Sequence, residues 1–322
     1  MLLLVIAGCL HAEPVLKRSS FQQAAMGTVF KIDLFAQDES TAASASAAAF
    51  ERVEALNRIC SDYLPDSELI RLCQAGSMKV SDDLFRILDI SRTIAKQTGG
   101  AFDPTIGHLT NLWRRSKRKG ILPTDAQLIK AKALTKWRYL MLDDKTKEVT
   151  LAMPGMQLDL GGIAKGFAAD EALAVLKHHG ITRAVVSASG DLAIGDPPPG
   201  EAGWEIGLRT FEAAESQDKQ IKLRLANCGV STSGDLHQWT EIDGVRYSHI
   251  IQPATGLGLT QRIACSVIAP NATTSDSLAT TMCVLGREKG GAVLPLFEKT
   301  SARFVDLDAE GKVRETKTPG FP

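Results

Sequence analysis

The sequence predicts an α+β fold, in which mixed, largely antiparallel sheets are flanked by helices in a single two-lobed unit. Segments that alternate apolar and polar residues, as half-buried strands do, are interspersed with helical segments. Two short strands at 139–142 and 148–151 are joined by Asp143-Asp144-Lys145. This spacing is typical of a hairpin and favours antiparallel pairing over a doubly wound parallel sheet. No low-complexity linker divides the 322 residues, so we expect one compact unit.

The composition is that of an ordinary folded protein. Lys and Arg together number 37, as do Asp and Glu, so the formal net charge is zero. A mainly electrostatic nucleic-acid binder would carry a clear basic excess, so nucleic acid is not an expected partner. A chain of this length buries enough surface to fold without disulfides. The six cysteines are therefore not a scaffold, and Cys265 and Cys283 are expected in the core.

The first ten residues, MLLLVIAGCL, form an apolar run that suits the core of a signal peptide. The run is too short to span a bilayer, which takes about 20 residues. Ile6-Ala7-Gly8-Cys9 looks like a bacterial lipobox, in which Cys9 would be lipidated after cleavage. Soluble export with cleavage after Ala12 and a buried N-terminal strand are the alternatives. We expect an export signal, lipobox and tether over 1–20 and the functional domain over 21–322.

Alternation predicts the strands, and capping residues with helical periodicity predict the helices. Strands are expected at 28–36, 139–142, 148–151 and 184–189. Helices are expected at 40–59, at 84–98 after the N-cap segment Ser81-Asp82-Asp83, at 126–134 after Thr124, and at 167–179. The basic run 114–120, RRSKRKG, is expected to be a solvated loop, with a phosphate contact as the alternative. Loops are expected at 197–200 and, as a hairpin tip, at 212–219.

The segment 158–166, LDLGGIAKG, combines a glycine turn with the start of a helix. Glycines let the backbone approach a ligand closely, and the free N–H groups of a helix N-terminus favour anions. Lys165 adds a positive charge. A phosphate site is the functional interpretation, and a tight turn into a helix is the alternative.

Asp276 and Thr280 are four residues apart, so on a helix they share one face. A carboxylate and a hydroxyl are oxygen ligands of the kind that Mg²⁺ prefers, and phosphate oxygens and backbone carbonyls can complete its coordination. The alternative is that both residues are structural: Asp276 stabilises the helix N-terminus, and Thr280 packs against its neighbours.

His249 ends a short strand just before a Pro- and Gly-containing turn, within YSHIIQPATG at 247–256. A histidine in such a place can act as a general base near neutral pH, although it can also be purely structural. Phe102 lies in GGAFDPTIG at 99–107. We expect it to pack in the core, and contact with a flat ring ligand is the alternative. Gly190-Asp191-Leu192 and the segment 231–235, STSGD, are loops that can line a cleft.

Together these segments resemble the ApbE family of FAD:protein FMN transferases. The resemblance runs from about residue 26 to residue 286, and its marks occur in the family's order. They are Met26-Gly27-Thr28, 61–68, 101–104, 159–166, Ser189-Gly190-Asp191, 231–235, 249–256 and 276–280.

The resemblance implies that FAD binds in a cleft between the two lobes, with Mg²⁺, or alternatively Mn²⁺, at its pyrophosphate. Such enzymes move FMN onto a Ser or Thr of a target flavoprotein, form a phosphoester bond and release AMP. The implied FAD contacts are Met26, Tyr63, Ala101, Phe102, Asp103, Asp159, Lys165 and Ile250. The implied metal ligands are Asp276, Thr280 and a backbone carbonyl of Gly162 or Ala164, and His249 would activate the acceptor hydroxyl.

The same resemblance implies a lipoprotein that is anchored through Cys9 at the periplasmic face of the bacterial inner membrane. Two positions depart from the family pattern. Gln252 stands where an Asp is usual, and Cys73 stands where an Asn is frequent. Two other functions remain open: an Mg-dependent pyrophosphatase that splits FAD to FMN and AMP, and a flavin-binding lipoprotein without turnover.

Overall fold

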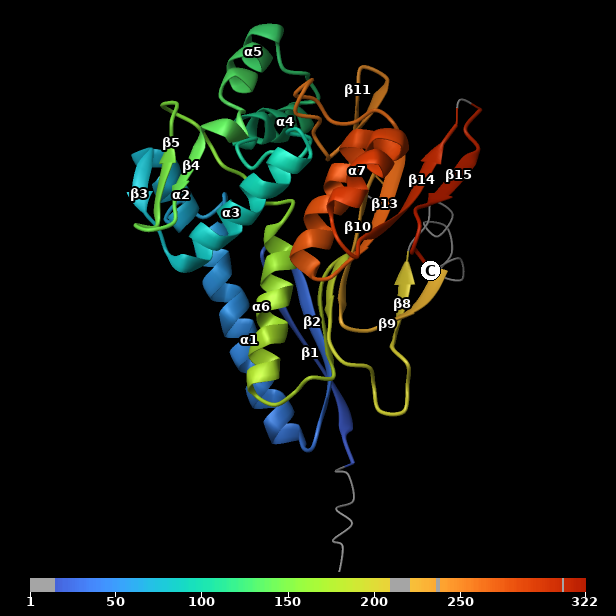
Figure 1. Ribbon diagram of the computed structural model, residues 1–322. Coiled ribbons are helices and arrows are strands. Elements are labelled where there is room, and N and C mark those ends of the chain that lie inside the picture. Colours follow the sequence, from blue (N-terminus) through green and yellow to red (C-terminus); the bar gives the residue numbers. More distant parts are fainter. Residues whose placement is uncertain (1–14, 209–220, 236–237, 309) are drawn as a thin grey trace, which may run out of the picture.

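The computed structural model describes residues 15–208, 221–235, 238–308 and 310–322. Its main layer is an antiparallel sheet whose strands lie in the order β1 (Lys17–Ala25), β2 (Thr28–Ala36), β6 (Ala184–Ala188), β7 (Asp191–Ile194), β10 (Cys228–Gly234), β13 (Ile263–Ala269), β14 (Ser301–Leu307) and β15 (Val313–Lys317). Helices α1 (Glu39–Cys60), α6 (Ala164–His178) and α7 (Ala272–Val293) cover one face of it (Figure 1). The ribbon of β8 (Trp204–Leu208) and β9 (Ile221–Leu225) packs on the other face. The expected α+β fold is confirmed.

Alternation along the strands separates two apolar layers. In β6, Ala184 and Val186 belong to the large core under the helices, whereas Val185 belongs to the cluster under β8 and β9. Successive side chains of a strand point to opposite faces, so a sheet covered on both sides reads as continuously apolar. Cys265 and Cys283 lie in the large core, as expected.

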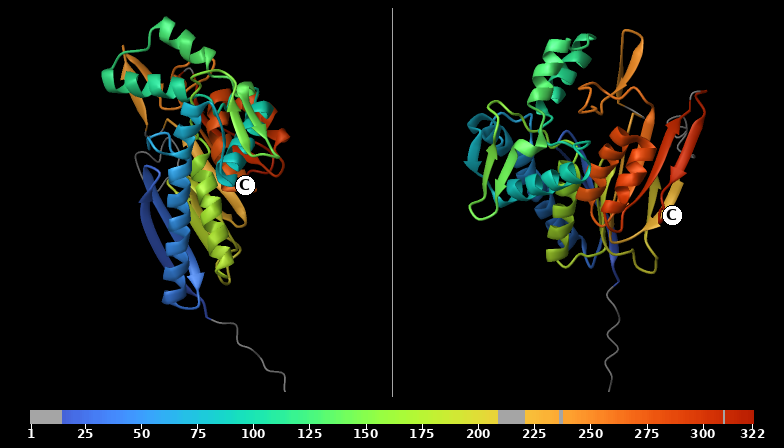
Figure 2. Two further views of the ribbon diagram at one scale, coloured as in Figure 1. Left: turned by 90° about the vertical axis from the view of Figure 1, so that its left-hand side faces the viewer. Right: turned by 45° about the horizontal axis from the view of Figure 1, so that its top comes forward.

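A second lobe lies at one end of the sheet (Figures 1 and 2). It consists of α4 (Gly107–Lys119), α5 (Asp125–Ala133) and the hairpin of β11 (Trp239–Ile242) and β12 (Val245–Ser248). These elements share an apolar cluster that is separate from the large core, formed by Leu109, Trp113, Leu128, Ala131, Ile242, Tyr247 and Ile251. The remaining elements are α2 (Glu68–Ala75), α3 (Asp82–Gln97), a sheet of β3 (Ser77–Lys79), β5 (Glu148–Leu151) and β4 (Leu140–Asp143), and the 3₁₀ turns Trp137–Tyr139 and Leu294–Leu296.

The capping residues begin the helices where the sequence predicts. Ser81 Oγ accepts a hydrogen bond of 3.2 Å from the N–H of Leu84 at the start of α3. Thr124 and Gln127 form a capping box at the start of α5. Each cap satisfies a backbone donor that the helix itself leaves unpaired. The hairpin of β4 and β5 is confirmed as well.

Five elements differ from the sequence predictions. Two segments expected as loops, 190–192 and 231–235, are mostly strand, because β7 begins at Asp191 and β10 extends to Gly234 as neighbours in the main sheet. The basic run 114–120 is not a solvated loop: most of it is the last part of α4, which ends at Gly120 with a φ of 65°. The buried side chains of Leu109 and Trp113 keep this polar segment helical. Helix α6 begins at Ala164 rather than at residue 167. Strand β1 begins at Lys17, within the expected tether, and pairs with β2 along its whole length.

Some predictions fall outside the described residues. The apolar run 1–10 with Cys9 is one, and the hairpin tip at 212–219 is another. Within the ranges that the structure describes, no helix is long and apolar enough to cross a membrane.

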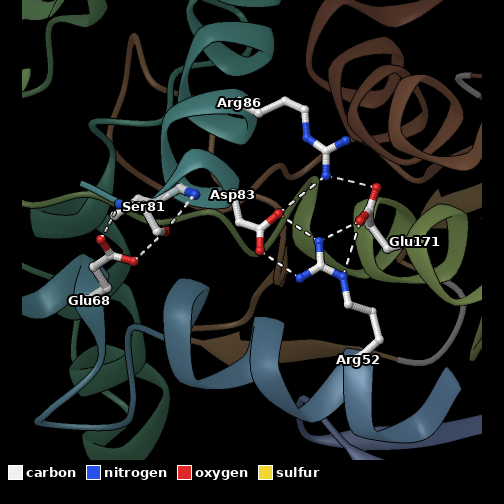
Figure 3. Close-up of polar contacts among 7 residues, drawn as sticks. Arg52, Glu68, Ser81, Asp83, Arg86 and Glu171 are labelled. Atoms are coloured by element: carbon white, nitrogen blue, oxygen red, sulfur yellow. Dashed lines mark hydrogen bonds and ion pairs between the residues drawn. The ribbon is translucent and has the colours of Figure 1, made fainter. Parts of the chain in front are cut away.

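An ion-pair network ties three helices together (Figure 3). Arg52 of α1 donates two hydrogen bonds of 2.6 Å to Asp83 of α3 and one of 3.1 Å to Glu171 of α6. Arg86 adds a contact of 2.8 Å to Glu171. The hydrogen bond from Arg52 holds the pKa of Asp83 below its usual value. Glu68 of α2 accepts from both the N–H and the hydroxyl of Ser81, each at 2.6 Å, so α2 is joined to α3.

Helices α6 and α7 cross in direct contact at Gly166. A Cβ added to Gly166 would lie 2.2 Å from the carbonyl oxygen of Ala272 and 2.8 Å from the Cβ of Asp276. Only glycine allows this approach, which places the start of α6 against the first turns of α7.

We predict that Gly166→Ala lowers the free energy of unfolding by about 1–3 kcal/mol, because the helices must separate to admit the methyl group. Gly291→Ala is the matched control. Gly291 is also helical but has no atom within 4 Å of an added Cβ. Alanine there should be neutral or stabilise by up to about 1 kcal/mol. Urea unfolding of both variants measures the difference, and equal stability would contradict the close crossing.

Candidate active site

A cavity of about 1240 Å³ lies where the sheet, the start of α6 and the second lobe meet. Seven of the residues implied by the resemblance line it: Met26, Tyr63, Ala164, Lys165, His249, Asp276 and Thr280. They come from segments that span most of the sequence. The structure therefore brings together the proposed phosphate, metal and base positions.

Met26 and Gly27 form the two-residue turn between β1 and β2. Their φ angles are 49° and 70°, and two positive values in succession fit the tight hairpin turn that matches strand twist. A non-glycine residue in this conformation costs of order 1 kcal/mol or more, and such strain is often found at ligand sites. The turn places Met26 on the cavity wall.

Three charged side chains form the centre of the cavity. The ammonium group of Lys165 is hydrogen-bonded to Asp191 and lies 3.7 Å from Oδ1 of Asp276. Asp276 is only 2% exposed, and its Oδ2 accepts a hydrogen bond of 2.9 Å from the N–H of Gly166. Burial, followed by the charge of Asp191, raises the pKa of Asp276 to about 7. Burial alone would lower the pKa of Lys165, but the two carboxylates outweigh it and raise that pKa.

Thr280 lies one turn after Asp276 on α7, and its hydroxyl is 3.1 Å from that of Ser233. The glycine turn faces it, because a Cβ on Gly162 would be 3.7 Å from the Thr280 hydroxyl oxygen. The N–H of Gly166 bonds to Asp276 rather than to the carbonyl of Gly162, its partner in a regular helix. The Gly162 carbonyl thus lacks this helical bond, whereas Ala164 is the first residue of α6 and lines the cavity, so the choice between the two carbonyls remains a prediction.

The donor set fits a hard divalent cation. Among the described residues no group of three or more His, Cys, Asp or Glu side chains could hold a metal ion. Asp276, Thr280 and the Gly162 carbonyl offer oxygen atoms only, and a cation held by them would take its other ligands from phosphate or water. The residues present thus suit a metal that arrives with a phosphate ligand.

His249 follows β12 and lines the cavity. Its backbone N–H and its ring Nδ1 both lie 3.1 Å from the carbonyl oxygen of Gln238. A carbonyl can only accept, so Nδ1 carries the proton and Nε2 of the neutral ring is free to take one. Burial lowers the pKa of His249, and the charges of Lys117 and Lys165 act in the same direction. The ring is therefore neutral at pH 7.

Tyr63 is 74% exposed, and its ring is covered by the guanidinium group of Arg114 at 4.1 Å. Arg114 also contacts Oδ2 of Asp62 at 2.5 Å and Oδ2 of Asp159 at 3.8 Å. Burial, followed by the charge of Asp159, raises the pKa of Asp62. Arg114 thus holds two neighbouring carboxylates and one aromatic ring at the edge of the cavity.

The other implied residues lie outside the cavity lining. Phe102 and Ile250 are buried in the large core. Asp103 accepts hydrogen bonds from the N–H and hydroxyl of Thr105, at 2.9 and 2.6 Å, and from the N–H of Trp137 at 3.1 Å. Asp159 accepts from the N–H of Gly161 at 2.7 Å. These four, Ala101 and Gly162 are absent from the lining, so their contacts with FAD or a metal remain predictions.

The sequence points to the segments of Asp191 and Arg114 but not to their partners. Asp191 lies in a loop expected to line a cleft and in the motif Ser189-Gly190-Asp191, and Arg114 begins the basic run that has a phosphate contact as its alternative. Nothing local points to the Gln238 carbonyl, because its partner His249 is 11 residues away along the chain.

The two departures from the family pattern leave local structure intact. The loop after His249 is closed by backbone bonds at Gln252, whose N–H reaches Leu257 and whose carbonyl accepts from Gly256. Cys73 Sγ accepts from the N–H of Leu158 at 3.3 Å, at the start of the glycine turn.

The chain is similar to known flavin transferases. An FAD:protein FMN transferase of Treponema pallidum is 36% identical over 260 residues, which cover 76% of this chain and 72% of that protein. One from Klebsiella pneumoniae is 30% identical over 302 residues, covering 90% of this chain and 86% of its own length. The solved structure of the flavin transferase ApbE from Vibrio cholerae has a TM-score of 0.84 at 26% identity, covering 95% of this chain and 99% of that one.

A further structure, the flavinyl transferase ApbE of Pseudomonas stutzeri in its apo form, has a TM-score of 0.81 at 28% identity and covers 94% of this chain. The model of the ApbE family matches residues 26–304, which include all the cavity motifs described above. The chain therefore belongs to the ApbE family.

Proposed function

We propose that the protein transfers FMN from FAD to a Ser or Thr hydroxyl of a target flavoprotein and releases AMP. The observation that carries this proposal is the presence, in one cavity, of the Lys165–Asp191–Asp276 centre and of His249, whose ring Nδ1 is bonded to the Gln238 carbonyl. The family membership and the names of the relatives support it.

In this reaction the acceptor oxygen bonds to the phosphorus of the FMN half. The pyrophosphate P–O bond breaks, and AMP leaves with the bridging oxygen. Nε2 of His249 takes the hydroxyl proton, a task for which neutral imidazole is suited near pH 7. Lys165 offsets the negative charge of the pyrophosphate, while the glycine turn and the start of α6 admit it closely.

A divalent cation, Mg²⁺ or Mn²⁺, is part of the proposal. Asp276, Thr280 and the carbonyl of Gly162 would hold it, and when bound it supplies charge neutralisation at the pyrophosphate. FAD would extend from this centre along the cavity, with Met26 at the β1–β2 turn and with Tyr63 and Arg114 at the edge.

The decisive experiment incubates the protein with FAD, Mg²⁺ and a purified target flavoprotein. Flavin fluorescence that stays with the denatured target means transfer and supports the proposal. Free FMN with AMP would mean a pyrophosphatase, and unchanged FAD would mean a flavin-binding protein without turnover. Either of these outcomes overturns it.

Export and lipid anchoring are a separate proposal, which rests on the lipobox-like segment alone. We propose that Cys9 is lipidated and holds the protein at the periplasmic face of the inner membrane. We expect Cys9→Ser to move the protein from the membrane fraction to the soluble fraction without changing transfer in vitro. A protein that is soluble with Cys9 intact, or cleaved after Ala12, would refute the anchor.

We predict that Asp276→Asn lowers the transfer rate by at least about 100-fold, because it removes the anionic oxygen that would face the cation. The rate that remains should respond much more weakly to added Mg²⁺. Asp33→Asn is the matched control, since Asp33 is a carboxylate of the same cavity paired with Lys31 at 2.8 Å. Metal titrations of both variants decide the matter, and metal-stimulated activity that survives in Asp276→Asn would place the metal elsewhere.

We predict that His249→Asn slows transfer by about 10²- to 10⁴-fold, the usual contribution of a general base. The affinity for FAD should stay within a few-fold, because other residues bind it. Single-turnover rates and a flavin-binding titration give the two quantities. A parallel collapse of affinity would make His249 a ligand-binding residue, and an unchanged rate would direct the search to the carboxylates of the cavity, with Asp191 first.

A further inference from the structure

The hairpin of β11 and β12 carries His249 but has little support from its own pairing. Among the described residues its two strands pair only with each other, at four positions. A two-stranded ribbon is marginally stable by itself, so contacts outside its own pairing must set its position. At the end of β12 the N–H of Ser248 donates to the carbonyl of Leu259 at 2.7 Å, and side chains supply the other contacts. The question is which contacts fix the Gln238 carbonyl, because that carbonyl orients the His249 ring.

One face of the hairpin packs on the helices of the second lobe. Tyr247 meets Trp113 of α4 edge-on, with 5.4 Å between ring centroids, and Ile242 lies in the same cluster. This contact holds Tyr247, two residues before His249. Trp239, which follows Gln238, lies on the opposite face of the hairpin.

The other face is joined to the main sheet by Arg246. Trp239 pairs with Ser248 and Glu241 with Arg246, so Trp239 and Arg246 are diagonal neighbours on one face. The Arg246 guanidinium lies 3.9 Å from the centroid of the Trp239 ring. Its Nε donates to Oδ2 of Asp235 at 3.0 Å, and its Nη2 donates to the Asp235 carbonyl at 2.9 Å.

Asp235 is buried and held in place by the main sheet. It is 3% exposed and directly follows β10, and its N–H donates to the carbonyl of Ile263 at 3.3 Å. Arg262 adds a contact of 3.6 Å to the same carboxylate oxygen. The Arg246 guanidinium is rigid and forked. Because it binds two acceptors and also stacks on an indole, it has one preferred position, which a lysine cannot reproduce.

We propose that Arg246 is a positioning residue for the reaction: by joining Asp235 to Trp239 it fixes the adjacent Gln238 carbonyl, which keeps Nε2 of His249 free and directed to the cavity. This inference rests on the proposed role of His249 as the base. Arg246 itself touches no reacting atom. Its effect passes through one backbone carbonyl to the ring.

The test compares Arg246→Gln with wild type by two independent readouts. Because misplacement of a reacting group by about 1 Å can cost about 100-fold, we expect kcat to fall about 10- to 100-fold, with KM for FAD within about threefold. In ¹⁵N-histidine NMR of the protein without substrate, the His249 signal should change from the Nδ1–H tautomer to a mixture. The His249→Asn protein identifies that signal by its absence.

Three further variants complete the design. Arg246→Lys should recover little activity, because it loses the fork and the stacking, whereas Asp235→Asn should retain more, because its amide oxygen still accepts from Arg246. Arg224→Gln is the control, since Arg224 of β9 pairs with Glu201 in an exposed ion pair away from the hairpin. It should match wild type in both readouts.

The outcomes separate the inference from the proposed function. An unchanged tautomer and kcat in Arg246→Gln overturn the inference. Equal losses of kcat and FAD affinity, together with a lower unfolding midpoint, also overturn it, because they indicate a merely structural arginine. If the wild-type protein transfers no FMN, the proposed function fails, and the NMR comparison still decides whether Arg246 sets the ring's tautomer.

Discussion

The contact between Gly166 and α7 is the constraint on which the site depends. Because no side chain separates the helices there, the N–H of Gly166 reaches the carboxylate of Asp276 in the next helix. The same approach places Lys165 beside Asp276 and commits the N–H of Gly166 to Asp276 rather than to the Gly162 carbonyl. The close crossing of α6 and α7 thus determines the charged groups, the hydrogen-bond donors and the open space of the cavity.

The two lobes contribute different chemistry. The helix-covered sheet supplies the charged centre, with Lys165 from α6, Asp191 from β7 and Asp276 from α7. The second lobe supplies His249 on a ribbon and Arg114 on α4. The cavity lies where the two lobes meet. The position of one lobe relative to the other therefore sets the distance from His249 to the phosphate site. Two arginine side chains cross between the lobes, Arg246 to Asp235 and Arg114 to Asp62.

Much of this arrangement was predictable, and the failures have physical causes. The pair of Asp276 and Thr280 followed from helical spacing, and the caps at Ser81 and Thr124 followed from local hydrogen bonding. Strand β1 was missed because it is a polar edge strand: it gains its structure from pairing with β2, not from an apolar pattern. Arg114 was misplaced because burial of Trp113 in the second lobe, a tertiary effect, keeps its basic segment helical. The ion pair of Lys165 with Asp191 joins residues 26 positions apart and has no local signature.

The thiols of the core have a chemical consequence. Among the described residues the cysteines are Cys60, Cys73, Cys228, Cys265 and Cys283, and all are unpaired. Burial raises the pKa of Cys60 and Cys283 to about 12. At pH 7 only about one such thiol in 10⁵ is the thiolate that oxidants and disulfides attack. Packing therefore protects these thiols kinetically, so the protein can keep unpaired cysteines even where oxidants are present. The Cys60 thiol, which lines the cavity, would not compete there as a nucleophile.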